Sequence, residues 1–253
     1  MTADWSPLAR ELARWRAEGR ALPLWWRDDD AVAPTPALEQ LMALSDRLGL
    51  PLHLAVIPEP ATEALADICR GLLGVVPMVH GWAHANHAAQ GQKKAEFGAP
   101  REGQAKEAAA GLARLRALFD DDLLAVFVPP WNRLDAALLP ALAGMGFAGI
   151  STFTPRAARL EAPGLVQINA HVDPIDWRGG GGLLPEDALL ARITETLAAR
   201  RTGATDATEP LGLLTHHLVH DAALWDFTAR FIAMLLDAGA LPVNLRDQRE
   251  DLP

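Results

Sequence analysis

Short apolar runs alternate along this chain with longer stretches in which apolar residues recur every three or four positions. Such short runs are typical of strands buried on both faces, and the longer stretches are typical of amphipathic helices. Strands are predicted at 22–27, 52–57, 74–79, 123–128, 147–152, 165–170 and 211–216, with a short last one at 241–245. Helices are predicted at 5–18, 36–48, 60–72, 102–119, 134–144, 185–200 and 221–238.

Prolines and glycines fall at the boundaries of these predicted helices. Pro36 and Pro185 stand at helix starts, where a missing N–H costs little, and Gly49 and Gly239 stand at helix ends. The alternation of strand and helix predicts a mainly parallel sheet with both faces covered. The number of units favours a closed (β/α) barrel, with a doubly wound open sheet as the alternative.

The composition is that of a folded domain. Half of the 253 residues are hydrophobic, and no run approaches the roughly 20 apolar residues that span a bilayer. The first 20 residues are charged and interrupted, so they do not resemble a signal peptide, and we expect a cytoplasmic protein. The single cysteine, Cys69, excludes an internal disulfide. No linker divides the chain, so we expect one catalytic domain over 1–253, with the helix in 1–20 packed on the barrel.

The net charge narrows the range of partners. At −9 it argues against a general nucleic-acid binder, which needs a basic surface to neutralise phosphates. A small-molecule or glycan substrate is the expected partner, and the sequence does not indicate an oligomeric state.

Two histidines four residues apart, His80 and His84, follow the predicted strand at 74–79. Three aspartates, Asp28 to Asp30, follow the first predicted strand. Two imidazoles and one carboxylate leave a metal with an open position for water and substrate, which is how catalytic zinc sites are built. Zinc is therefore the expected metal, although cobalt, nickel and iron(II) accept the same donors.

Each of the chemically suggestive clusters lies at the end of a predicted strand. In a parallel barrel, these ends meet on one face, where active sites form. The clusters are Asp28 to Asp30, His80, Pro129 to Trp131, Asp173 to Trp177, and His216 with His217.

In this order, the clusters resemble the five motifs of the polysaccharide deacetylases of carbohydrate esterase family 4, the NodB homology domain. The matching segments are Trp26-Arg27-Asp28-Asp29-Asp30, His80-Gly81-Trp82-Ala83-His84, Phe127-Val128-Pro129-Pro130-Trp131, Asp173-Pro174-Ile175-Asp176-Trp177 and Leu214-Thr215-His216. The resemblance implies an α/β fold, a distorted (β/α)7 barrel. It also implies a metal-dependent hydrolase in carbohydrate metabolism, which removes an N-acetyl group from an amino sugar or a related N-acylated substrate.

The resemblance also implies roles for individual residues. Asp28 is expected to be the general base and His216 the general acid, while Asp29, His80 and His84 hold the metal. The residues expected to contact the substrate are Pro130, Trp131, Asp176 and Trp177.

Two departures from the family pattern bear on these roles. Val128 stands where the family has an arginine that orients the catalytic aspartate, and we expect Arg27 or Arg133 to contact Asp28 or Asp176 instead. Asp30 stands where the family has glycine, so the alternative register makes Asp29 the base and Asp30 the ligand.

Further polar residues are expected to surround the centre. They are Arg27, Asp30, His87, Arg133 and His217. Two other functions stay open at this point: a non-catalytic glycan-binding relative that lost the motif arginine, and a metal-dependent hydrolase of another linear or cyclic amide.

Overall fold

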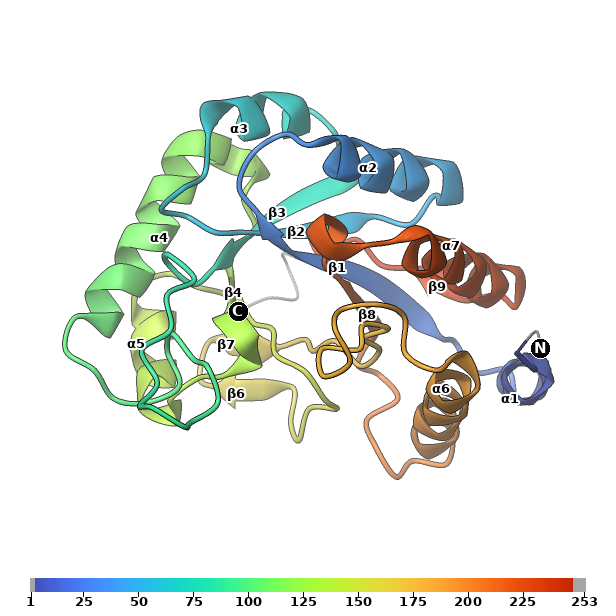
Figure 1. Cartoon of the computed structure of the whole chain (residues 1–253). Helices are drawn as coiled ribbons and strands as arrows, with labels where there is room; N and C mark the ends of the chain where they lie inside the picture. Colours follow the sequence, from blue (N-terminus) through green and yellow to red (C-terminus); the bar gives the residue numbers. More distant parts are fainter. Residues whose placement is uncertain (1–2, 248–253) are drawn as a thin grey trace.

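The computed structural model describes residues 3–247, and its elements follow the predicted alternation closely (Figure 1). The helices are α1 (Ser6–Ala17), α2 (Pro36–Leu48), α3 (Glu63–Cys69), α4 (Gln104–Phe119), α5 (Leu139–Gly144), α6 (Glu186–Arg201) and α7 (Ala222–Asp237). The strands are β1 (Pro23–Ala31), β2 (Leu52–Val56), β3 (Val75–His80), β4 (Val126–Val128), β5 (Gly149–Ile150), β6 (Leu160–Ala162), β7 (Leu165–Gln167), β8 (Leu211–Thr215) and β9 (Leu241–Pro242). Short 3-10 turns are η1 (Asp120–Asp122), η2 (Pro130–Asn132), η3 (Ala136–Leu138) and η4 (His217–Val219).

The strands form one mainly parallel sheet in the order β6-β7-β5-β4-β3-β2-β1-β8, and β9 pairs with β1. The β6–β7 pair is antiparallel. A single parallel bridge, Val172 to Leu213, connects the segment after β7 to β8. Figure 1 shows the helices arranged around the outside of the strands. The predicted α/β class with a mainly parallel sheet is therefore confirmed.

Strands β4, β7 and β9 and helix α3 are shorter than predicted, and three other elements differ more. Strand β6 was not predicted, because its residues are largely exposed and lack an apolar run. Strand β5 is reduced to Gly149–Ile150. The helix expected at 134–144 begins as the turn η3, in which the Asp135 side chain accepts from the Ala137 N–H.

Two apolar clusters lie on the two faces of the sheet. Trp25 belongs to an inner cluster with Met78 and Val128, whereas Trp26 belongs to the larger cluster between the sheet and the helices. Successive side chains of a strand point to opposite faces, so Arg27 and Asp29 follow the inner face of Trp25 and Asp28 follows the outer face of Trp26.

Helix α1 packs against α6, at the outer edge of the molecule in Figure 1, and Trp5 just before it contacts α7. The Trp15 indole donates to the carbonyl of Leu197, and the Trp5 ring lies 5.6 Å from the ring of Phe227. Among residues 3–247, no helix has the length and apolar character that a membrane span requires.

Candidate metal centre

Asp30, His80 and His84 form a three-ligand group at the carboxyl ends of β1 and β3. Their ligand atoms all lie within 4.8 Å of one another. The Asp30 Oδ1 lies 3.1 Å from His80 Nε2 and 3.3 Å from His84 Nε2. His80 is buried, whereas the side chains of Asp30 and His84 are 28% and 24% exposed, so the group is open to solvent on one side.

The surroundings of His80 determine which of its two ring nitrogens carries the proton when the ring is neutral. Its Nδ1 lies 2.9 Å from the carbonyl oxygen of Val128, which can only accept. The proton of the neutral ring must therefore be on Nδ1, which directs the Nε2 lone pair at the Asp30 carboxylate. Two acceptors at 3.1 Å repel unless a cation or a proton lies between them, so this donor set fits a divalent metal.

The charges in this group shift its pKa values. Burial acts to raise the pKa of Asp30, but the hydrogen bond and charge of His80, with the charges of His216 and His84, hold it well below its usual range. Burial acts to lower the pKa of His80, and the carboxylates of Asp29 and Asp30 raise it above the usual value. The pKa of His84 is lowered, chiefly by burial and by the charge of His80. The carboxylate therefore stays ionised and available to a metal.

Asp30 reaches the histidines because the backbone of β1 departs from regular extended geometry. The β1–β2 pairing shifts register between Asp28 and Ala31, and Asp30 has a φ of 76°. This irregularity turns the Asp30 side chain away from the outer face that strict alternation would give it. The structure therefore brings Asp30, as in the alternative register, to the two histidines, and Asp29 is not part of that group.

A buried carboxylate, Glu96, holds the loop that carries His84. It is 2% exposed and accepts from the backbone N–H groups of Trp82, Ala83 and Ala85 at 3.2, 2.8 and 3.3 Å. Gly81 is required beside it, because its φ is 59° and a Cβ there would lie 2.3 Å from Glu96 Oε2. The sequence analysis missed Glu96, which lies in an irregular loop with no motif around it.

Asp29 is paired with Arg27 on the inner face of the sheet. The Asp29 carboxylate lies 2.9 Å from Arg27 Nε and 3.1 Å from Nη2, and the two side chains are 3% and 0% exposed. The predicted partners of the arginines are therefore wrong. Arg27 contacts Asp29 and neither Asp28 nor Asp176, and Arg133 donates to the carbonyl of Lys94.

Asp28 lies on the outer face, enclosed by the segment that follows β8. Its carboxylate accepts from Thr215 Oγ1 at 2.6 Å, from the His217 N–H at 3.0 Å and from His217 Nδ1 at 2.5 Å. All three residues are buried. The expectation that Asp28 acts as the general base conflicts with this placement, since its acceptors are occupied and it is not part of the metal-ligand group.

His216 follows β8 and faces the fourth motif. Its ring meets that of Trp177 edge-on at 4.7 Å, and its Nδ1 is buried without a hydrogen-bond partner. Asp173 accepts from the Trp177 indole at 2.8 Å. Burial raises the pKa of Asp173, with the charge of His216 acting against that rise. Asp176 instead accepts from the N–H groups of Arg178 and Gly179, so it orders its own loop.

Strained backbone gathers at this centre. Of the six non-glycine residues with positive φ in the described part of the chain, four lie here: Asp30, His84, Trp131 and Asn132. Each such residue costs roughly 1–2 kcal/mol relative to ordinary backbone, and clusters of them persist mainly where function requires them. The strain places the Trp131 ring 4.2 Å from that of His84.

The other predicted residues lie around this centre. Pro130 stands against Gly81, where an added Cβ would meet its ring at 2.5 Å. His87 is exposed and belongs to a second group with Glu96 and Glu107. In that group both Glu107 oxygens are bound by Arg101, and Glu96 is taken up by backbone N–H groups, so we assign no metal to it.

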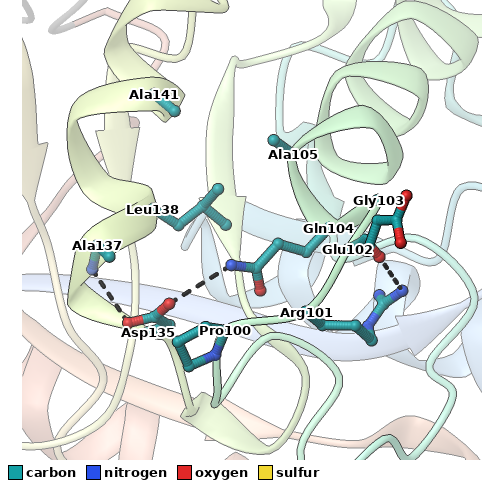
Figure 2. Close-up of a pocket in the computed structure, with 10 residues that line it drawn as sticks. All are labelled: Pro100, Arg101, Glu102, Gly103, Gln104, Ala105, Asp135, Ala137, Leu138 and Ala141. Carbon is teal, nitrogen blue, oxygen red and sulfur yellow. Dashed lines mark hydrogen bonds between the residues drawn. The ribbon is translucent and has the colours of Figure 1, made fainter.

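A separate pocket of about 530 Å³ lies between the start of α4 and the turn η3 (Figure 2). Figure 2 shows Gln104 reaching across it to Asp135, at 3.4 Å. None of the metal-centre residues lines it, so we assign it no part in the chemistry.

No family model matches the sequence, and no curated protein matches it significantly. Solved structures similar over most of the chain are polysaccharide deacetylases of carbohydrate esterase family 4. A putative polysaccharide deacetylase from Mycobacterium smegmatis is 20% identical, with a TM-score of 0.60 over 85% of this chain and 76% of that one. An acetyl xylan esterase from Clostridium thermocellum, solved with a cobalt ion, is 14% identical, with a TM-score of 0.50 over 91% and 92%.

A mutant of a pseudoenzyme of the same family, with restored enzymatic activity, is also similar. It is 13% identical, with a TM-score of 0.56 over 87% of this chain and 64% of that one. These similarities confirm the predicted fold.

Proposed function

We propose that this protein is a metal-dependent deacetylase that hydrolyses the N-acyl amide bond of an amino sugar or a related compound. The observation that carries the proposal is the group of Asp30, His80 and His84, in which His80 Nε2 faces the Asp30 carboxylate at 3.1 Å. A bound divalent metal, for which zinc is the first choice, supplies the positive charge that activates water and polarises the acyl carbonyl.

Asp29 is the residue best placed to act as general base. It adjoins the ligand Asp30 in the chain, and its charge raises the pKa of His80, so it lies within electrostatic reach of the centre. Arg27 holds the Asp29 carboxylate at 2.9 Å, and a carboxylate oriented in this way can take a proton from the attacking water.

His216 is the proposed general acid. An amine leaves poorly unless it is protonated, and His216, which follows β8, lies beside Trp177. Its charge contributes to lowering the pKa of Asp30. The imidazolium would deliver its proton to the departing nitrogen.

Two tryptophans flank the centre and suit a sugar ring. Trp131 lies against His84, and Trp177, 53% exposed, lies against His216. Aromatic faces at this spacing around an open metal position would hold the N-acyl group between the base and the acid. A cytoplasmic location, which we also propose, would favour a soluble sugar, a nucleotide sugar or a lipid-linked precursor.

A non-catalytic, glycan-binding function is the second candidate. It is favoured by Val128, which replaces the motif arginine, and by the similarity to a structure derived from a pseudoenzyme. Hydrolysis of another linear or cyclic amide is the third candidate.

The test is acetate release from N-acetylglucosamine and its oligomers by the zinc- or cobalt-loaded protein, with a formamide and a cyclic imide alongside. Deacetylation that is abolished by chelator and restored by metal supports the proposal. Turnover of the imide or formamide alone would select the third candidate. Glycan binding without turnover of any amide would select the non-catalytic one.

A further inference from the structure

Arg27 is a fully buried arginine on β1 with partners on two other segments. Besides Asp29, its guanidinium donates to Asn132 Oδ1 at 2.7 Å, to Ser151 Oγ at 2.7 Å and to the carbonyl of Thr152 at 3.2 Å. The contact with Asp29 is one hydrogen bond from Nη2 to Oδ2 at 3.1 Å, with Nε 2.9 Å from Oδ1 at ion-pair distance but without hydrogen-bond geometry.

The Asn132 contact connects this pair to the wall of the pocket. Asn132 and Trp131 are consecutive residues with φ near 55°, and Trp131 lies against the ligand His84. A bond from a rigid guanidinium to Asn132 offsets part of the cost of that turn. One side chain therefore contacts both the carboxylate beside the metal ligand and the turn that carries the pocket tryptophan.

Position 128 shows why this arginine can lie on β1. Val128 is fully buried in the inner cluster that also holds Trp25, and Trp25 lies two residues before Arg27 on β1. On β4, Val128 pairs with His80 of β3. The guanidinium of Arg27 already lies on the inner face of the sheet, and the apolar side chain of Val128 on β4 leaves room for it there.

We propose that Arg27 is the positioning residue of this centre: it orients the Asp29 carboxylate and anchors the Trp131–Asn132 turn from the first strand of the sheet. This inference rests on the proposed function. It explains how a chain with valine at 128 still has a charged partner for Asp29, the proposed base, and so why the chain can be catalytic without the motif arginine.

The test compares Arg27→Met, Arg27→Lys and Arg27→Met/Val128→Arg in the metal-loaded protein. Arg156→Met is the matched control, since Arg156 is also buried and paired, with Asp206 at 2.7 Å, away from the metal group. Four quantities are measured: thermal stability, metal affinity by competition with a chromophoric chelator, kcat and KM.

We expect Arg27→Met to bind metal with a Kd within about threefold of wild type while kcat falls at least about 100-fold, the scale of losing an oriented base. Arg27→Lys keeps the charge but not the planar guanidinium that bonds Asp29, Asn132 and Ser151 together, so its kcat should fall about tenfold. The double variant should regain at least about tenfold over Arg27→Met, and Arg156→Met should lose stability with kcat unchanged.

A folded, metal-loaded Arg27→Met or Arg27→Lys with wild-type kcat would overturn the inference. Loss of metal affinity in Arg27→Lys, which should fold even if Arg27→Met does not, would assign Arg27 to the metal site instead. Failure of the proposed function is a different result: the wild type would bind metal and turn over no amide.

Discussion

Replacing Asp28 is the clearest way to distinguish a structural carboxylate from a catalytic one in this chain. Three buried donors converge on it: the Thr215 hydroxyl, the His217 N–H and the His217 Nδ1. The Thr215 oxygen already accepts from the Trp26 indole at 2.8 Å, so its own proton is directed at Asp28. Asp28→Ala removes the acceptor from all three donors and leaves space where the carboxylate was.

The magnitude follows from the burial of these donors. Each buried donor without a partner costs about 1–3 kcal/mol, and breaking a buried pair as a whole costs about 3–5 kcal/mol. For a chain of this size, 1 kcal/mol lowers Tm by roughly 2–4 °C, so Asp28→Ala should lower Tm by roughly 10–15 °C. Asp28→Asn keeps an oxygen for Thr215 and for the His217 N–H, and it should lose roughly half as much.

The assay pairs thermal unfolding with metal affinity and kcat. Because Asp28 faces away from the metal group, Asp28→Asn should bind metal as wild type does and keep kcat within about tenfold. The reasoning is refuted if Asp28→Asn leaves Tm unchanged but lowers kcat by 10²-fold or more, about the effect of losing a general base.

Three further predictions follow from neighbouring groups. Asp30→Asn should abolish metal binding while Asp29→Asn keeps it and loses about 10²–10⁴ in kcat, measured by metal content and acetate release. Metal binding lost in Asp29→Asn and kept in Asp30→Asn would return the ligand role to Asp29. Glu96→Gln should weaken metal affinity about 10–100-fold through the His84 loop, checked by chelator competition; unchanged affinity would make Glu96 irrelevant to the centre. Burial lowers the pKa of His53 to about 4, so its contribution to the free energy of unfolding is full above about pH 6.5 and falls by roughly 3 kcal/mol toward pH 4, because the unfolded chain takes up the proton first. His53→Gln should flatten this part of the plot of unfolding free energy against pH, measured with denaturant. An unaltered slope would exclude His53 as its source.

The sequence was sufficient for the fold because its signals were local. Apolar runs and helical periodicity gave most of the strands and helices, and the parallel sheet explains why His80, Trp131 and His216 meet at one edge. The pairing of His80 and His84 followed from their spacing together with the aspartates after the first strand, and the structure brings both histidines to Asp30.

The roles of the three aspartates could not be predicted in the same way. The choice between Asp29 and Asp30 depends on a register shift and a positive φ in β1, which adjacent identical residues do not reveal. Glu96 contributes through tertiary contacts with backbone N–H groups. The prediction of the partner of Arg27 was wrong because it did not take account of strand alternation, which puts Arg27 and Asp29 on the same face of the sheet.

The measurement that tests the central claim most directly is metal binding by the chelator-treated protein, followed by titration with cobalt and its visible absorption, for wild type and His84→Ala. We predict about one equivalent with a distinct cobalt spectrum in the wild type, and loss of both in a folded His84→Ala. Absence of binding in the wild type, or equal binding in His84→Ala, would contradict the assignment of Asp30, His80 and His84 as a metal centre.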